Sequence, residues 1–92
     1  PPQSTQDAPT ETGDVVIHIA ADGRLALAGE PQARAPLLAS LAATLAARPQ
    51  TEVRIEADAR AEARAVIAFL EDLRATGVRR VELVTEPGEP RE

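Results

Sequence analysis

At 92 residues, the chain is long enough for one domain and too short for two. It contains no cysteine, which excludes disulfides, thiol chemistry and cysteine-based zinc sites. Its net charge is −5, and its ten basic residues are all arginine, so the excess of acid argues against nucleic acid or an anionic lipid surface as a partner.

Both ends of the sequence are polar and contain no large apolar residue, so neither can bury enough surface to offset the entropy cost of ordering it. We expect a flexible linker at residues 1–13, a folded domain at residues 14–86 and a disordered tail at residues 87–92. No apolar run approaches the ~20 residues needed to span a membrane, and there is no signal peptide. Because the sequence starts with Pro1 and not with methionine, we expect a longer protein whose membrane anchor precedes this segment.

Two strands joined by a tight turn are expected at the start of the domain. Residues 15–19 are a β-branched run, and residues 25–28 are a weaker apolar segment. Asp22-Gly23 between them is a strong hairpin signal, because glycine accepts the positive φ that such turns need. Gly29 and Pro31 are expected to end the second strand.

A helix is expected over residues 35–48, where apolar residues recur at helical spacing. Its apolar stripe consists of Leu37, Leu38, Leu41 and Leu45. Pro36 fits only the first turn, where its missing N–H costs nothing. Arg48-Pro49 ends the helix, because proline cannot continue it and the residue before proline avoids the α region.

Residues 52–58 alternate between apolar and charged side chains, which is typical of a strand with one buried and one solvated face. The inward set is Val53, Ile55 and Ala57, and the outward set is Glu52, Arg54, Glu56 and Asp58. This pattern places a charged strip on the face of the sheet that points away from the core.

A second helix is expected over residues 60–76, and a last strand over residues 78–85. The apolar stripe of this helix consists of Ala63, Val66, Ile67, Leu70 and Leu73. Asp58 suits the N-cap or the turn before the helix, and Gly77 suits the C-terminal cap. In the last strand, Val81 and Leu83 are expected to point inward.

The expected order of elements is β-β-α-β-α-β, a two-layer α+β fold. Because β-α-β units wind right-handed, both helices pack on one face of a single sheet when its strands are parallel and adjacent. The other face stays open and carries the charged side of residues 52–58 together with Val16, His18 and Val84. Such a face is either solvated or a surface for a partner or a second copy, and the sequence leaves both readings open.

No residues in the sequence form a recognisable catalytic, cofactor or metal site. His18 is the single histidine, and without cysteine it cannot build a usual zinc site. As a catalytic base it would need a nucleophile, and Ser40 in the middle of a helix is poorly placed. Glu56 and Asp58 share a strand face, but the arginines beside them indicate salt bridges and a helix cap in place of acid–base or metal chemistry. We therefore predict a binding protein and not an enzyme, with no metal and no cofactor.

The second half of the chain carries a more specific pattern. It runs Val53-Arg54-Ile55-Glu56-Ala57-Asp58, then a helix with Val66-Ile67-x-x-Leu70-x-x-Leu73-Arg74, then Gly77-Val78 and Val81-Glu82-Leu83-Val84-Thr85. Preceded by a strand, an Asp-Gly turn, a second strand and an Ala/Leu helix, this resembles the periplasmic domain of the ExbD/TolR family. The resemblance covers residues 14–86, and the linker expected at residues 1–13 stands where that family joins its membrane helix to this domain.

The resemblance implies a bacterial inner-membrane protein with a single transmembrane helix and this domain in the periplasm. Through that helix such proteins contact a proton channel of the ExbB/TolQ type, and together they convert proton motive force into work on the cell envelope. The family's proton-carrying aspartate belongs to the membrane helix, so no residue here is assigned to the proton step. The periplasmic head of the family forms a homodimer and contacts a TonB-like or TolA-like protein, and in TolR-type members it also engages peptidoglycan.

Three functions compete. We favour an ExbD-like head that binds a TonB-like protein and supports outer-membrane import, because the chain has no lysine and one aromatic residue and so offers little stacking surface for sugars. The alternative is a TolR-like head of the Tol-Pal system that binds peptidoglycan or TolA. The third is a small enzyme or a nucleic-acid-binding domain of ferredoxin-like shape, which would need a pocket around Glu56, Asp58 and His18.

Contacts with a partner or a second copy are expected on the last strand and on the first hairpin strand. The residues are Val16, His18, Val81, Leu83 and Val84. The physical reason is that an open sheet edge or face can add a partner strand through main-chain hydrogen bonds.

Overall fold

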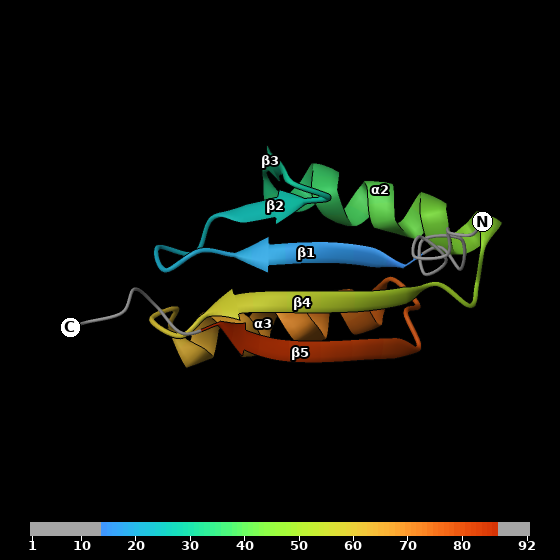
Figure 1. Ribbon diagram of the computed structural model, residues 1–92. Helices are drawn as coiled ribbons and strands as arrows, with labels where there is room; N and C mark the ends of the chain where they lie inside the picture. Colours follow the sequence, from blue (N-terminus) through green and yellow to red (C-terminus); the bar gives the residue numbers. More distant parts are fainter. Residues whose placement is uncertain (1–13, 87–92) are drawn as a thin grey trace, which may run out of the picture.

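The computed structural model describes residues 14–86, which form one five-stranded sheet and two helices (Figure 1). In chain order the elements are β1 (Val15–Ile19), β2 (Leu25–Leu27), β3 (Glu30–Gln32), α2 (Arg34–Ala47), β4 (Glu52–Asp58), α3 (Ala63–Ala75) and β5 (Arg80–Glu86). The linker predicted at residues 1–13 and the tail predicted at residues 87–92 lie outside the described residues.

The predicted α+β class is confirmed. The strands lie in the order β3-β2-β1-β4-β5. β1, β4 and β5 are parallel neighbours, whereas β2 and β3 continue the sheet antiparallel on the other side of β1. The crossovers through α2 and α3 step in the same direction across the sheet, and right-handed crossovers of this kind place both helices on one face.

The predicted Asp-Gly turn joins β1 to β2. The Gly23 N–H donates to the Ala20 carbonyl oxygen at 2.8 Å, and the Ala20 N–H donates to that of Arg24 at 2.9 Å. The φ of Gly23 is +91°, a value that a side chain rarely tolerates, which explains glycine at this position.

One strand of the sheet differs from the prediction. Gly29 and Pro31 were expected to end the second strand, and β2 does end before them, at Leu27. The chain then turns at Ala28 and Gly29, with φ of +52° and +87°, and forms β3 antiparallel to β2, a strand that was not expected. Pro31 is compatible with β3 because, among the described residues, β3 lies at the edge of the sheet, where a missing N–H breaks no pairing with an outer strand. β3 was missed because proline was treated as a strand breaker in every context.

The core lies between the helices and the covered face of the sheet. The buried apolar residues are Ile17, Ile19, Leu37, Leu41, Leu45, Val53, Ile55, Ala57, Phe69, Leu73 and Val78. The predicted inward sets of α2 and β4 are confirmed, with Leu38 only partly buried against this cluster. In a domain this small, each such side chain contributes roughly 1.5–3 kcal/mol when it leaves water.

The predicted stripe of α3 is wrong at three positions, one of which is Ala63, an exposed residue that was included in it. Phe69 was omitted from it, yet this side chain is 3% exposed and belongs to the core. Ile67 was included, yet it is 55% exposed. The buried side of the helix runs through Val66, Phe69 and Leu73, so Ile67 falls beside it, toward the sheet edge formed by β5.

At both ends of α3 the predicted residues form the turns, and of the two positions predicted for Asp58 the turn before the helix is the correct one. Asp58 lies in the turn before the helix, where its Oδ1 accepts the Arg60 N–H at 2.8 Å, while Glu62 takes the N-cap position. Gly77 follows the helix with φ of +103° and donates its N–H to the Arg74 carbonyl oxygen at 3.0 Å. These two turns fix where the chain leaves β4 and where it enters β5.

Candidate partner-binding site

β5 forms one edge of the sheet over seven residues. It pairs with β4 on one side, and no strand among residues 14–86 pairs with its other side. Its outer N–H and C=O groups are therefore available to another extended chain. By contrast, the opposite edge is the three-residue strand β3, which contains Pro31.

A groove runs along this edge on the helix side of the sheet. We define the β5 groove by its lining residues, which are Ile67, Leu70, Glu71, Arg74, Val81 and Leu83, around a volume of about 380 Å³. Three large apolar side chains in it are exposed to water: Ile67 by 55%, Val81 by 39% and Leu83 by 45%. Val81 and Leu83 were predicted to point inward, and they do lie on the helix-covered face, beside buried Val53 and Ile55. They stay exposed because β5 is an edge strand, and no further strand among the described residues covers them.

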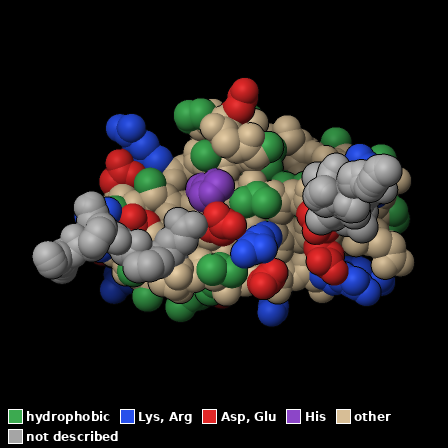
Figure 2. Space-filling model, in the orientation of Figure 1, with side chains coloured by type: hydrophobic (Ala, Val, Ile, Leu, Met, Phe, Trp, Pro, Cys, Tyr) green, Lys and Arg blue, Asp and Glu red, His purple; other side chains and the backbone are tan. Residues whose placement is uncertain are grey.

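No helix within residues 14–86 covers the other face of the sheet, and we call it the open face. Strand register places Val16 beside Arg54 and Glu82, and places His18 beside Glu56 and Val84. Figure 2 looks onto this face, where the purple histidine lies among acidic, basic and apolar side chains. Its polarity is mixed, in contrast to the mainly apolar β5 groove.

The five predicted contact residues therefore lie on two surfaces. Val81 and Leu83 belong to the β5 groove, whereas Val16, His18 and Val84 belong to the open face. β5 contributes to both surfaces because its side chains alternate between the two faces of the sheet. A strand added at its edge would reach Val81, Leu83 and Val84 of β5, whereas Val16 and His18 lie on β1, on the far side of β4.

A charged network occupies the centre of the open face. His18 Nε2 lies 2.9 Å from Glu56 Oε1, and Arg54 Nε lies 3.2 Å from Glu56 Oε2. The Glu56 side chain is 20% exposed, so its carboxylate is held between two partners and partly shielded from water. The sequence prediction paired Glu56 with arginine but missed His18, because this contact depends on β1 and β4 being neighbours.

The second carboxylate of the strand has a structural partner of its own. Hydrogen bonds from the Arg60 side chain, and then from the Arg60 backbone N–H, hold the pKa of Asp58 below its usual value. Both carboxylate oxygens are engaged, Oδ1 at 3.0 Å from Nε and Oδ2 at 3.1 Å from Nη2. This confirms a salt-bridged turn and gives Asp58 no geometry for acid–base chemistry.

Neither a metal-binding cluster nor a membrane-spanning helix is found among the described residues. Within residues 14–86, no three histidine, aspartate or glutamate side chains gather closely enough to hold a metal ion. Across the same range, neither helix has the length and apolar character required to cross a bilayer. One signal could have identified the β5 groove from sequence, namely the position of β5 as the last strand of a parallel series.

Comparison with known proteins adds the family. No curated protein matches the sequence. The model of a family described as "Biopolymer transport protein ExbD/TolR" matches residues 1–88. Proteins of that family are inner-membrane transport proteins and not enzymes, and they work in general with ExbB/TolQ and TonB/TolA proteins. The chain belongs to the ExbD/TolR family.

Proposed function

We propose that this domain is the periplasmic partner-binding head of an inner-membrane complex of the ExbB–ExbD–TonB type. In this proposal residues 1–13 connect the head to a membrane helix beside an ExbB-like proton channel. The complex converts proton motive force into work that supports import across the outer membrane. The head supplies no chemistry; it holds the partner that transmits the force.

The observation that carries this proposal is the free edge of β5 beside the β5 groove. An extended segment of a TonB-like partner can pair with β5 through main-chain hydrogen bonds. Its alternate side chains would then enter the groove and cover Ile67, Val81 and Leu83, which are 39–55% exposed. Fully burying one such side chain is worth roughly 1.5–3 kcal/mol, so partial cover of three adds only a few kcal/mol to the main-chain hydrogen bonds, and we expect weak binding, in the millimolar range.

The same edge also suits a second copy of this chain, and we propose a homodimer that uses it. Antiparallel pairing of two β5 strands would bring the exposed groove residues of both copies together. Partner peptide and second copy then compete for one edge. Sedimentation equilibrium with and without peptide tests this: we expect peptide to lower the dimer fraction, and an unchanged fraction at saturating peptide contradicts a shared edge.

NMR titration with a peptide from a TonB-like periplasmic segment tests partner binding. We expect saturable shift changes in β5 and in the facing side of α3. Leu83→Ser removes groove surface and should weaken binding about tenfold, whereas Val16→Ser, a matched change on the open face away from the edge, should leave affinity within about twofold. Absence of shift changes at millimolar peptide would rule out that partner.

The alternative within the family is a TolR-like head. Sedimentation with purified sacculi separates the two: an ExbD-like head stays in the supernatant, and a wall-binding head pellets. The open face and the β5 groove contain no phenylalanine, tyrosine or tryptophan side chain, which favours the ExbD-like assignment because sugar rings stack on such faces.

A further inference from the structure

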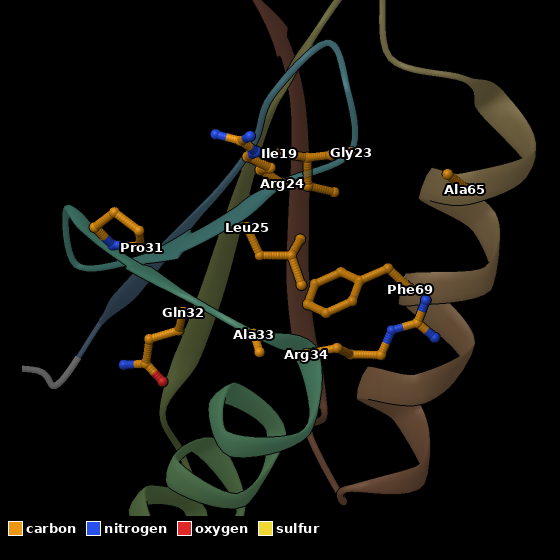
Figure 3. Close-up of a pocket in the computed structure, with 10 residues that line it drawn as sticks. All are labelled: Ile19, Gly23, Arg24, Leu25, Pro31, Gln32, Ala33, Arg34, Ala65 and Phe69. Atoms are coloured by element: carbon orange, nitrogen blue, oxygen red, sulfur yellow. The ribbon is translucent and has the colours of Figure 1, made fainter.

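A second hollow lies on the same side of the sheet as the helices, at the end where β1 finishes (Figure 3). It has a volume of about 470 Å³, which is within the range of small-ligand pockets. Its walls come from the β1–β2 turn, the end of β3 with the start of α2, and the first turns of α3. None of its lining residues belongs to the β5 groove.

The floor of this hollow is apolar. It consists of Ile19 and Phe69, each 3% exposed, and the partly buried Leu25. Figure 3 shows the Leu25 and Phe69 side chains directed toward one another across the hollow. Small residues border the opening, with Gly23 on the turn and Ala65 on α3, and of the three floor residues Leu25 is the one that keeps appreciable exposure.

The charged lining of the hollow is exclusively basic. Arg24 and Arg34 line it, and no acidic residue does, although the whole chain carries a net charge of −5. Each arginine has an acidic neighbour: Arg24 Nε is 3.3 Å from Asp22 Oδ2, and Arg34 Nη1 is 3.1 Å from Asp72 Oδ2.

These ion pairs leave the arginines available to a ligand. The side chains are 85% exposed for Arg24 and 57% exposed for Arg34. Exposed pairs of this kind contribute about 0–1 kcal/mol. A carboxylate held above the apolar floor can therefore take over guanidinium donors from Asp22 or Asp72 at little cost, and can do so with two hydrogen bonds from one arginine.

We propose that this hollow binds a carboxylate joined to a branched aliphatic group. The aliphatic group rests on Ile19, Leu25 and Phe69, and the carboxylate binds Arg34 with help from Arg24. Two sources share this chemistry, namely a peptide that ends in a leucine-like residue and a free branched acid. The site is separate from the β5 edge, so its binding and the proposed TonB-like contact succeed or fail independently.

Three probes test the site by NMR titration of the 92-residue chain. They are N-acetyl-alanyl-leucine, its C-terminal amide, and 4-methylpentanoate. We expect saturable shift changes at Gly23, Arg34 and Ala65 with the acid peptide, and binding about tenfold weaker with the amide. Binding of the peptide without the small acid assigns the site to peptide ends, binding of the small acid without the peptide assigns it to free acids, and binding of both supports the shared chemistry.

Matched variants locate the site. Ala65→Leu fills the opening and should weaken binding at least about tenfold, while Ala68→Leu, an equal change at an exposed position of the same helix outside the hollow, should not. Arg34→Gln should weaken acid binding about tenfold, with Arg48→Gln at the far end of α2 as its control. The amide probe tests the carboxylate of the ligand, whereas the Ala65→Leu and Arg34→Gln variants test the opening and the guanidinium of the protein. Each measurement therefore reports on a different part of the site.

Three results would overturn the proposal. The first is the absence of saturable shifts with both the acid peptide and 4-methylpentanoate up to about 10 mM, well above a millimolar Kd. The second is equal binding of the acid and the amide, which would remove the role of the carboxylate. The third is equal effects of Ala65→Leu and Ala68→Leu, which would place binding elsewhere.

Discussion

His18 and Glu56 lie side by side in the centre of the open face, with 2.9 Å between Nε2 and Oε1, although 38 positions separate them in the sequence. The contact exists because β1 and β4 are parallel neighbours in a register that aligns these two residues. The Glu56 carboxylate therefore connects β4 to β1 through His18, while its other oxygen binds Arg54 of its own strand. Four predictions follow from relationships of this kind.

Glu56→Gln should destabilise the fold by about 1 kcal/mol at neutral pH, because the neutral amide forms no ion pair with Arg54 and makes a weaker hydrogen bond with His18. Urea unfolding measures the change. Glu71→Gln, on the exposed side of α3, is the control and should change stability by less than about 0.5 kcal/mol. A double-mutant cycle with His18→Gln should give a coupling energy of about 0.5 kcal/mol; a coupling of zero would mean that the pair adds nothing.

Asp58→Asn should destabilise the fold in a pH-dependent way. The folded-state pKa of Asp58 is lowered, mainly by the Arg60 side chain, so its stabilisation is present above its unfolded pKa and lost as pH falls through the folded pKa. The unfolded pKa is about 3.9, so the difference between wild type and variant should be full at pH 7 and should shrink below about pH 4. Urea midpoints from pH 7 to pH 2.5 measure it. A difference that stays constant over that range would contradict the role of the charge.

Phe69→Ala should destabilise the fold by about 3 kcal/mol, because it empties a buried site between α3 and the sheet. Ile67→Ala, two residues away on the same helix, should cost less than about 1 kcal/mol, since Ile67 is 55% exposed. Thermal and urea unfolding of both variants measure the contrast. The reverse order would show that the apolar stripe expected from the sequence, with Ile67 inside, is the correct one.

Gly77→Ala should destabilise the fold by about 1 kcal/mol through backbone strain alone. The φ of Gly77 is +103°, and an added Cβ would meet no atom within 4 Å, so no steric clash contributes. Gly77→Asn should cost less, because asparagine tolerates positive φ better than alanine. Urea unfolding compares the two variants. An equal loss of unfolding free energy in both would contradict the role of the positive φ at residue 77.

The sequence by itself determined most of the local structure. Alternation in residues 52–58 gave the faces of β4, because the side chains of a strand alternate strictly and the apolar set must be buried. Gly23 and Gly77 marked the turns, because positive φ excludes most other residues. The absence of cysteine excluded thiol chemistry and cysteine-based zinc sites, and the spacing of residues 53–85 was specific enough to suggest the family.

The tertiary structure alone decided how these faces meet. Burial of Phe69 in place of Ile67 depends on the angle at which α3 lies over the sheet, which helical spacing does not fix. β3 exists because an edge position accepts Pro31, and edge positions are known only once the strand order is known. The pairing of His18 with Glu56, the exposure of Val81 and Leu83, and the hollow above Phe69 all depend on contacts between residues far apart in the chain. Local propensity carries no information about such contacts, so the surfaces on which the proposed functions rest appear only when the sheet is assembled.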